Sequence, residues 1–193
     1  MFLRIVFTII GLAVVGAGPA YAQQAGGSKS LGVFDAWTAY VLNENGQQVC
    51  YMVAKAHPAK NKKLKRGAAW LTITHRPGEN SKDVVSYTSG YNFKPSSDVD
   101  IRIGKDSFNL FTEKDIAWSR DAKTDHELAA AIRKNTSLTL TGVPAARNAG
   151  SVVDALDVRG GAAAYSAIGK ACGYPDNANP KPVVKKKANT GNK

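Results

Sequence analysis

The sequence predicts a mainly β protein, either an antiparallel β-sandwich or a partly open barrel, with two short peripheral helices. Short runs of β-branched and aromatic residues recur from Leu31 onward, and only two segments carry a helical pattern. Several of the runs alternate apolar and polar residues with the period of two that is typical of half-buried strands. The composition supports a folded domain, since 44% of the 193 residues are hydrophobic and 21% are charged.

The first two expected strands form a hairpin. Residues 37–42 (WTAYVL) and 48–53 (QVCYMV) are rich in β-branched and aromatic side chains. Between them lies Asn-Glu-Asn-Gly at 43–46, and an Asn-Gly pair is a strong signal for a tight hairpin turn. Two further strands are expected at 68–74 and 84–89.

The clearest alternation occurs at residues 99–103, where Val99, Ile101 and Ile103 should share a buried face. Gly104 and Lys105 then form a tight turn into a strand at 107–111, because glycine adopts positive φ without steric cost. The last strands are expected at 138–142 and 152–158.

Two helices interrupt the β pattern. Thr124 and Glu127 match a capping box, in which each side chain would bond the other residue's backbone amide. Leu128, Ala131 and Ile132 follow at helical spacing. The small-residue segment 162–171 is the second expected helix.

Both ends of the chain differ from the domain between them. Residues 1–22 have a positive charge, an apolar stretch and an Ala-Tyr-Ala ending, so we expect a signal peptide cleaved near Ala22 and a periplasmic or secreted protein. We further expect a flexible leader at 23–30, a β domain at 31–173 and a disordered basic tail at 174–193. No segment after residue 22 is apolar enough to cross a membrane.

Export favours a disulfide between Cys50 and Cys172, the only two cysteines in the chain. The bridge would tie an early strand to the end of the domain. The alternative of a reactive thiol pair lacks a C-x-x-C motif.

The sequence carries no catalytic motif, and no cofactor is predicted. No metal site is predicted either, because no two of His57, His75 and His126 have metal-ligand spacing. A spatial Ser/His/Asp arrangement remains open, since the members of a triad need not be near in sequence. The aromatic residues, among them Trp37 and Trp70, could form a stacking platform, but core packing is the favoured interpretation because most lie in expected strands.

The strongest functional signal is positive charge. The net charge is +11, and residues 55–66 hold six Lys or Arg in twelve positions of an expected loop. This run either keeps the protein soluble or binds polyanions such as lipopolysaccharide, anionic phospholipid or host glycans, whereas export argues against nucleic acid. The candidate polyanion-binding residues are Lys60, Lys62, Lys63, Lys65, Arg66, Lys185, Lys186 and Lys187.

A series of short motifs resembles the invasion-associated locus B family. The motifs are FDAW at 34–37, CYMV at 50–53, THRP at 74–77, SGYNFKP at 89–95, FNLFT at 108–112, AW at 117–118 and IRKNTSL at 132–138, followed by Cys172. The resemblance spans about residues 34–173. It implies an exported β-rich protein of alphaproteobacteria, a family named for host-cell entry, with no enzymatic activity or cofactor.

These observations together predict a non-enzymatic, exported envelope protein that contacts host or other surfaces through its basic loop. The alternative is a small periplasmic ligand carrier or hydrolase with a pocket between the sheets. A deep cleft near His75 would favour that alternative.

Overall fold

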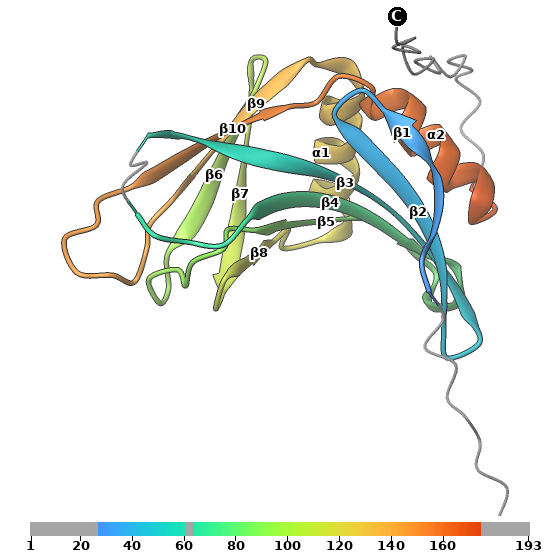
Figure 1. Ribbon diagram of the computed structural model, residues 1–193, viewed down its shortest axis with the longest axis horizontal. Helices are drawn as coiled ribbons and strands as arrows, with labels where there is room; N and C mark the ends of the chain where they lie inside the picture. Colours follow the sequence, from blue (N-terminus) through green and yellow to red (C-terminus); the bar gives the residue numbers. More distant parts are fainter. Residues whose placement is uncertain (1–26, 61–63, 175–193) are drawn as a thin grey trace, which may run out of the picture.

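The computed structural model describes residues 27–60 and 64–174, except for the side chain of Lys60 (Figure 1). The expected signal peptide, residues 23–26 of the leader and residues 175–193 of the tail lie outside the described residues. Ten strands, two α-helices and one short 3-10 helix make up the described chain. Their bounds are β1 Lys29–Phe34, β2 Trp37–Glu44, β3 Gln47–Lys60, β4 Ala69–Arg76, η1 Pro77–Glu79, β5 Ser81–Thr88, β6 Asp98–Ile103, β7 Asp106–Glu113, β8 Ile116–Trp118, α1 Ala122–Lys134, β9 Ser137–Gly142, β10 Val152–Asp157 and α2 Gly161–Ala171.

Eight of the strands close into an antiparallel barrel, which confirms the predicted mainly β fold. Their order is β3-β10-β9-β6-β7-β8-β5-β4, and β4 pairs back onto β3. β2 and β1 extend the sheet beyond β3. The strand β3 makes this possible because it has 14 residues: its first part pairs with β2 and β4, and its last residues pair with β10.

The predicted alternation decides which side chains fill the barrel. Val99, Ile101 and Ile103 point inward and are 0%, 0% and 1% exposed, as expected. Inward-facing residues of the other strands join them in one continuous buried cluster with residues of both helices. Burial of this apolar surface is the main source of stability for such a fold.

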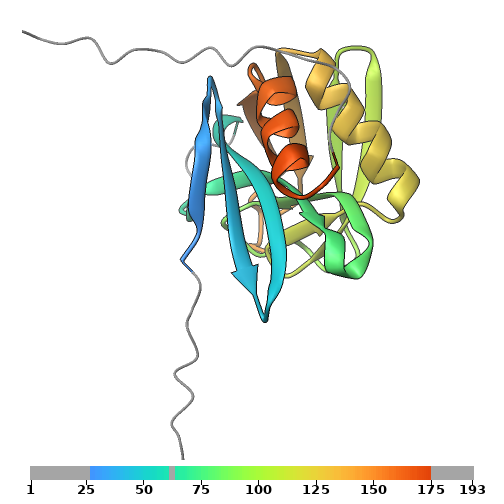
Figure 2. The ribbon, with the colours of Figure 1, turned by 90° about the vertical axis from the view of Figure 1, so that its right-hand side faces the viewer.

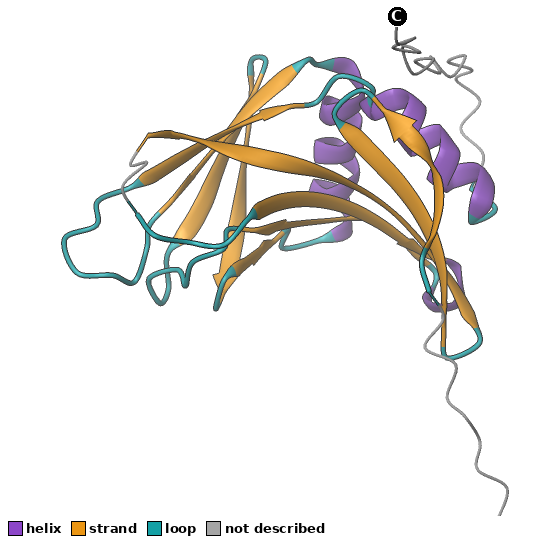
Figure 3. Ribbon diagram, viewed as in Figure 1, coloured by secondary structure: helices purple, strands orange, loops and turns teal. Residues whose placement is uncertain are grey.

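The two helices lie side by side, away from the segment 64–68 that leads into β4 (Figures 1, 2 and 3). The helix α1 packs against β5 and β7, and α2 packs against β1, β2 and β3. Neither described helix is long and apolar enough to span a lipid bilayer.

The helix α1 begins earlier than the capping box predicted. Asp121 is the N-cap, and its carboxylate accepts a hydrogen bond of 2.8 Å from the backbone N–H of Thr124. Thr124 therefore lies inside the first turn and donates its hydroxyl to Asp121. The predicted pairing of Thr124 with Glu127 is wrong, since an ionised carboxylate three residues upstream is the better acceptor at the positive helix terminus.

Several strands also differ from the sequence-based prediction, either in their bounds or because they were not expected. The strand β1 begins at Lys29, inside the expected flexible leader, because it pairs with β2. The strand β3 continues to Lys60, so the first half of the basic segment is strand rather than loop. The strand β8 has only three residues, too few to produce a visible alternation.

Candidate functional site

Four loops that are far apart in sequence meet at one end of the barrel, which we call the loop end. They are residues 64–68, 89–97, 114–115 and 143–151. Backbone hydrogen bonds join the 89–97 loop to each of the other three: Gly67 donates to Gly90 at 2.9 Å, Phe93 donates to Lys114 at 2.7 Å and Lys94 donates to Val143 at 2.8 Å. The antiparallel topology creates this meeting point, because all four connections leave strands on the same side.

Glycines allow the closest of these approaches. Gly90 has φ of +74°, and a Cβ there would lie 2.5 Å from the carbonyl oxygen of Gly67. Any side chain at position 90 would therefore push the 64–68 segment away from the barrel.

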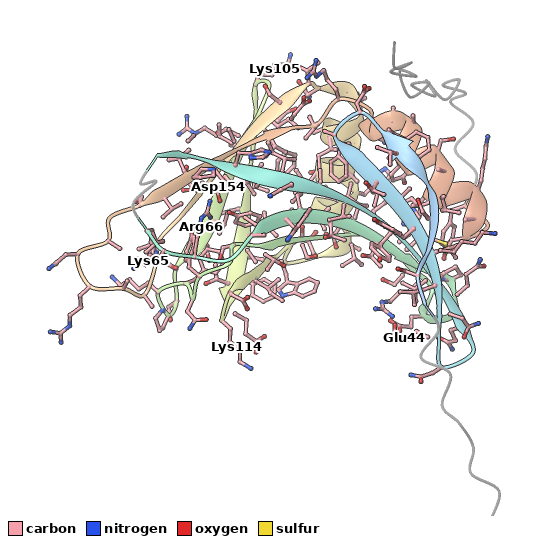
Figure 4. All side chains as sticks on the ribbon, viewed as in Figure 1. Glu44, Lys65, Arg66, Lys105, Lys114 and Asp154 are labelled. Atoms are coloured by element: carbon pink, nitrogen blue, oxygen red, sulfur yellow. A yellow bond between two sulfur atoms is a disulfide. The ribbon has the colours of Figure 1, made fainter. Side chains whose placement is uncertain are left out.

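The loop end gathers cationic side chains. Lys65, Lys94, Lys114 and Arg147 are all exposed there, one from each loop, and we call them the basic set. Lys65 and Lys114 are visible at this end in Figure 4. The backbone of Lys60 ends β3 at the same place. Lys114 has two acidic neighbours: Glu113 ends β7 and is exposed, whereas Asp115 lies in the loop and is half-buried. Cations therefore outnumber carboxylates among the described exposed residues of the four loops.

Of the candidate residues predicted from sequence, only Lys65 is a described and exposed cation. Lys62, Lys63, Lys185, Lys186 and Lys187 lie outside the described residues. Sequence reasoning missed Lys94, Lys114 and Arg147, because each is an isolated charge in its own segment. Only the pairing of distant strands places them beside Lys65.

Arg66 does not belong to the exposed basic set, which corrects the assignment made from its position in the basic run. Its guanidinium forms a two-pronged ion pair with Asp154 of β10 and also donates to the carbonyl of Ser89 at 3.0 Å. The side chains of Arg66 and Asp154 are 8% and 0% exposed. The adjacent lysine points to solvent while Arg66 points inward (Figure 4).

Two tyrosines complete the polar network around this ion pair. The hydroxyl of Tyr87 donates to Asp154, and the ring of Tyr91 lies 5.7 Å from the guanidinium carbon of Arg66. Burial, followed by the hydrogen bond to Asp154, raises the pKa of Tyr87. Burial opposes the charged form of Arg66, but its hydrogen bond and attraction to Asp154 together raise its pKa. The network is therefore a charged clamp that holds the 64–68 segment on the barrel.

A recess of about 450 Å³ opens beside this clamp, between β3 and the 64–68 segment. Lys55, His57, Leu64 and Arg66 are among the residues that line it. Its mixture of basic and apolar side chains suits an anionic group with an apolar neighbour.

The histidine examined as a possible catalytic residue lies elsewhere and is fully buried. Nδ1 of His75 accepts a hydrogen bond of 3.1 Å from the backbone N–H of Asp83, and burial lowers the pKa of this imidazole. The carboxylate of Asp83 accepts from Tyr165 at 2.5 Å and contacts Nδ1 of His126 at 2.8 Å. Because His75 is 0% exposed, it does not line the cleft that the hydrolase or carrier alternative would require.

The predicted disulfide between Cys50 and Cys172 is present and joins β3 to the end of α2. The described cysteines therefore include no free thiol. Within residues 27–60 and 64–174, no cluster of three or more His, Cys, Asp or Glu residues could hold a metal ion.

Comparison with known proteins places the chain in a family. The family model described as invasion associated locus B (IalB) protein matches residues 37–169. The crystal structure of invasion associated protein B from Bartonella henselae has a similar fold, with a TM-score of 0.50, 16% sequence identity, and coverage of 71% of this chain and 92% of that chain. No curated protein sequence matches significantly. The family model covers well over half of the chain, and the protein belongs to the invasion associated locus B family.

Proposed function

We propose that this chain is an exported, non-enzymatic protein of the bacterial envelope whose loop end binds polyanionic surfaces. The observation that carries the proposal is the convergence of Lys65, Lys94, Lys114 and Arg147 from four separate loops onto one end of the barrel. Clustered cations on a rigid scaffold produce a stronger local potential than the same charges spread over the surface.

Export is supported by the sequence pattern of residues 1–22. Intact mass and N-terminal sequencing of envelope material should find Gln23 as the first residue. A protein that retains Met1 would show that this part of the proposal is wrong.

The candidate partners share dense negative charge: lipopolysaccharide, anionic phospholipid and host glycans. The similar Bartonella protein is named as invasion associated, and a contact with host or bacterial surfaces fits that name. Lys62 and Lys63 belong to the same basic run of the sequence as Lys65 and would add their charge to it. We propose that Lys185, Lys186 and Lys187 of the tail make a second, tethered contact that raises avidity.

Two variants with the same change in net charge test the proposal. The loop-end variant replaces Lys65, Lys94, Lys114 and Arg147 by Gln. The control variant replaces four exposed lysines remote from the loop end, Lys105, Lys123, Lys134 and Lys170, by Gln.

Retention on immobilised dextran sulfate, a soluble sulfated polyanion, is the measurement. Because binding is electrostatic, the salt concentration needed for elution should fall strongly for the loop-end variant and only slightly for the control. If the salt concentration needed for elution fell equally in both variants, binding would depend only on net charge, and the proposal of a specific binding site at the loop end would be wrong.

A further inference from the structure

Two tryptophans, Trp70 and Trp118, lie on the outer face of the barrel, contrary to the expectation that the aromatic residues pack in the core, and Trp70 is the more exposed of the two. Trp70 of β4 is 38% exposed, whereas Trp37 is 0% exposed. The neighbours of Trp70 in β4, Ala69 and Leu71, point inward and are buried. Trp70 therefore faces outward by the alternation of the strand, and core packing does not account for its position.

Trp70 belongs to the last outward-facing row of the barrel wall before the loop end. Its direct partners in the neighbouring strands are Lys55 of β3 and Thr88 of β5, and Thr88 in turn pairs with Ile116 of β8. Residues directly opposite each other in an antiparallel sheet share a face. The row is bordered by the 64–68 segment with Lys65 on one side and by the loop of Lys114 on the other.

A second row lies behind the first, and its aromatic members are on β8 and β7. Thr72, Ser86, Trp118 and Phe111 are consecutive partners across β4, β5, β8 and β7, and all four are half-buried on the outer face. The guanidinium of Arg120 lies 5.8 Å from the ring of Phe111. On the outer face, Thr88 and Ser86 of β5 lie between Trp70 and the group formed by Ile116, Trp118 and Phe111. Cations and the carboxylate of Glu113 lie at the margins, and we call Trp70, Ile116, Trp118 and Phe111 the aromatic wall.

The position of Lys55 affects what Trp70 can bind. Its ammonium nitrogen lies 5.9 Å from the indole centroid, over the ring. A sugar that stacked on this side would have to displace the lysine. At a membrane surface the two side chains are compatible, because an indole favours the headgroup region while a lysine beside it reaches the phosphates.

We propose that the aromatic wall docks onto an anionic phospholipid bilayer, with Trp70 entering the headgroup region and Lys55, Lys65 and Lys114 contacting phosphates. This inference rests on the proposed function, since the loop end supplies the initial attraction. It names one class of polyanion, a lipid surface, because the wall adds an apolar component that a soluble polyanion cannot use. Glu113, which pairs with Ile116 at the far end of the row, orients the contact toward the Lys55 side.

The test compares Trp70→Thr with Val33→Thr. Threonine occurs at the neighbouring outer positions 72 and 88, so Trp70→Thr should fold normally. Val33 of β1 is the matched control, because it is the other large exposed apolar residue of the described chain, at 66%. Unchanged melting temperatures would verify that both variants are folded.

Binding is measured to vesicles of phosphatidylglycerol and phosphatidylcholine and, separately, to soluble dextran sulfate. Trp70→Thr should weaken vesicle binding about fivefold, as expected for losing partial burial of an indole. It should leave dextran sulfate binding unchanged, and Val33→Thr should change neither. Vesicles with brominated acyl chains should quench wild-type tryptophan fluorescence, and Trp70→Thr should lose most of that quenching.

The outcomes separate this inference from the proposed function. If Trp70→Thr bound vesicles as tightly as the wild-type protein and its fluorescence were quenched to the same extent, the docking of Trp70 would be wrong. The proposed binding of polyanions at the loop end would be unaffected by that result. An equal loss of vesicle and dextran sulfate binding would show that Trp70 contacts polyanions of any kind, which also overturns bilayer docking. If wild-type protein bound neither ligand, the proposed function itself would fail and this inference with it.

Discussion

The carboxylate of Asp154 receives both arms of the Arg66 guanidinium at the point where β3 and β4 separate. The pairing of β3 with β4 ends at Ala56 and Ala69. Beyond this point β3 no longer contacts β4 as a strand partner and pairs with β10 instead. The ion pair thus connects the chain to the barrel at the point where the backbone hydrogen bonds between β3 and β4 end. It joins the 64–68 segment to β10 inside the barrel and keeps Lys65 at the loop end.

Breaking this ion pair should be costly. Asp154→Asn leaves the buried guanidinium of Arg66 without a counter-charge, which is expected to reduce the free energy of unfolding by about 3–5 kcal/mol. The control is Asp98→Asn, because Asp98 pairs with Arg120 at 2.8 Å on the surface, where such pairs contribute about 0–1 kcal/mol. Urea unfolding measures both, and losses of similar size in the two variants would contradict the clamp.

The contrast between Lys65 and Arg66 shows what the sequence could not predict. The two residues are adjacent in a basic run, so composition assigns both to a solvated surface. Arg66 points inward because it pairs with the carboxylate of Asp154, which is 88 residues away in the sequence. The position of Asp154 depends on how β10 pairs with β3. The same long-range pairing closes the barrel and gathers Lys94, Lys114 and Arg147, and no local pattern carries that information.

Local patterns were reliable where local physics decides the structure. The Asn45-Gly46 turn forms as predicted, with φ of +53° and +80°. The alternation at 99–103 gives the buried face because that strand has one side in the core. The sequence does not predict the start of α1 correctly because Asp121 and Thr124 are both residue types that favour the N-cap position. In the structure Asp121 has the extended backbone of an N-cap, and Thr124 lies within the helix.

The disulfide should contribute strongly to stability. Cys50 and Cys172 are 122 residues apart, and closing a loop of that length restricts the unfolded chain by about 5 kcal/mol as an upper figure. The double variant Cys50→Ala, Cys172→Ala should therefore unfold at much lower urea concentration. Non-reducing peptide mapping of envelope material that found both thiols free would contradict the bridge.

Replacing the N-cap should destabilise α1. Asp121→Ala removes the acceptor for the Thr124 amide and should lower the melting temperature measurably. Glu127→Gln should cost almost nothing, because its contact with Lys123 is exposed and 3.9 Å long. Thermal unfolding measures the melting temperatures of both variants. A larger decrease for Glu127→Gln than for Asp121→Ala would favour the predicted capping box of Thr124 and Glu127 over the N-cap at Asp121.

The buried histidine should make stability depend on pH. Burial lowers the pKa of His75 in the folded protein, so the unfolded chain binds this proton more tightly. Stability should therefore fall as the pH drops below about 6.5, the ordinary pKa of histidine. Asp125 acts in the opposite sense at lower pH, because burial raises its pKa and its protonation favours the folded state.

Comparison with His75→Phe isolates the contribution of His75. Between about pH 7.5 and about pH 5.5, wild-type protein should lose more unfolding free energy than the variant. Titration of the His75 ring by NMR gives an independent result, since the ring should stay neutral at pH values where an exposed histidine is half charged. If the unfolding free energies of the wild-type protein and His75→Phe changed equally with pH, and the His75 ring titrated like an exposed histidine, His75 would not be a source of the pH dependence.

The proposed binding site predicts that polyanions contact the loop end in particular and are not held by the protein's overall charge. Hydrogen–deuterium exchange of the wild-type protein, with and without dextran sulfate, tests this claim by location. We expect dextran sulfate to slow exchange in the segments 64–68, 89–97 and 143–151 of the wild-type protein, and to cause no such slowing in the loop-end variant. Slowing confined to the helices or to β1, or slowing that persists unchanged in the loop-end variant, would contradict it.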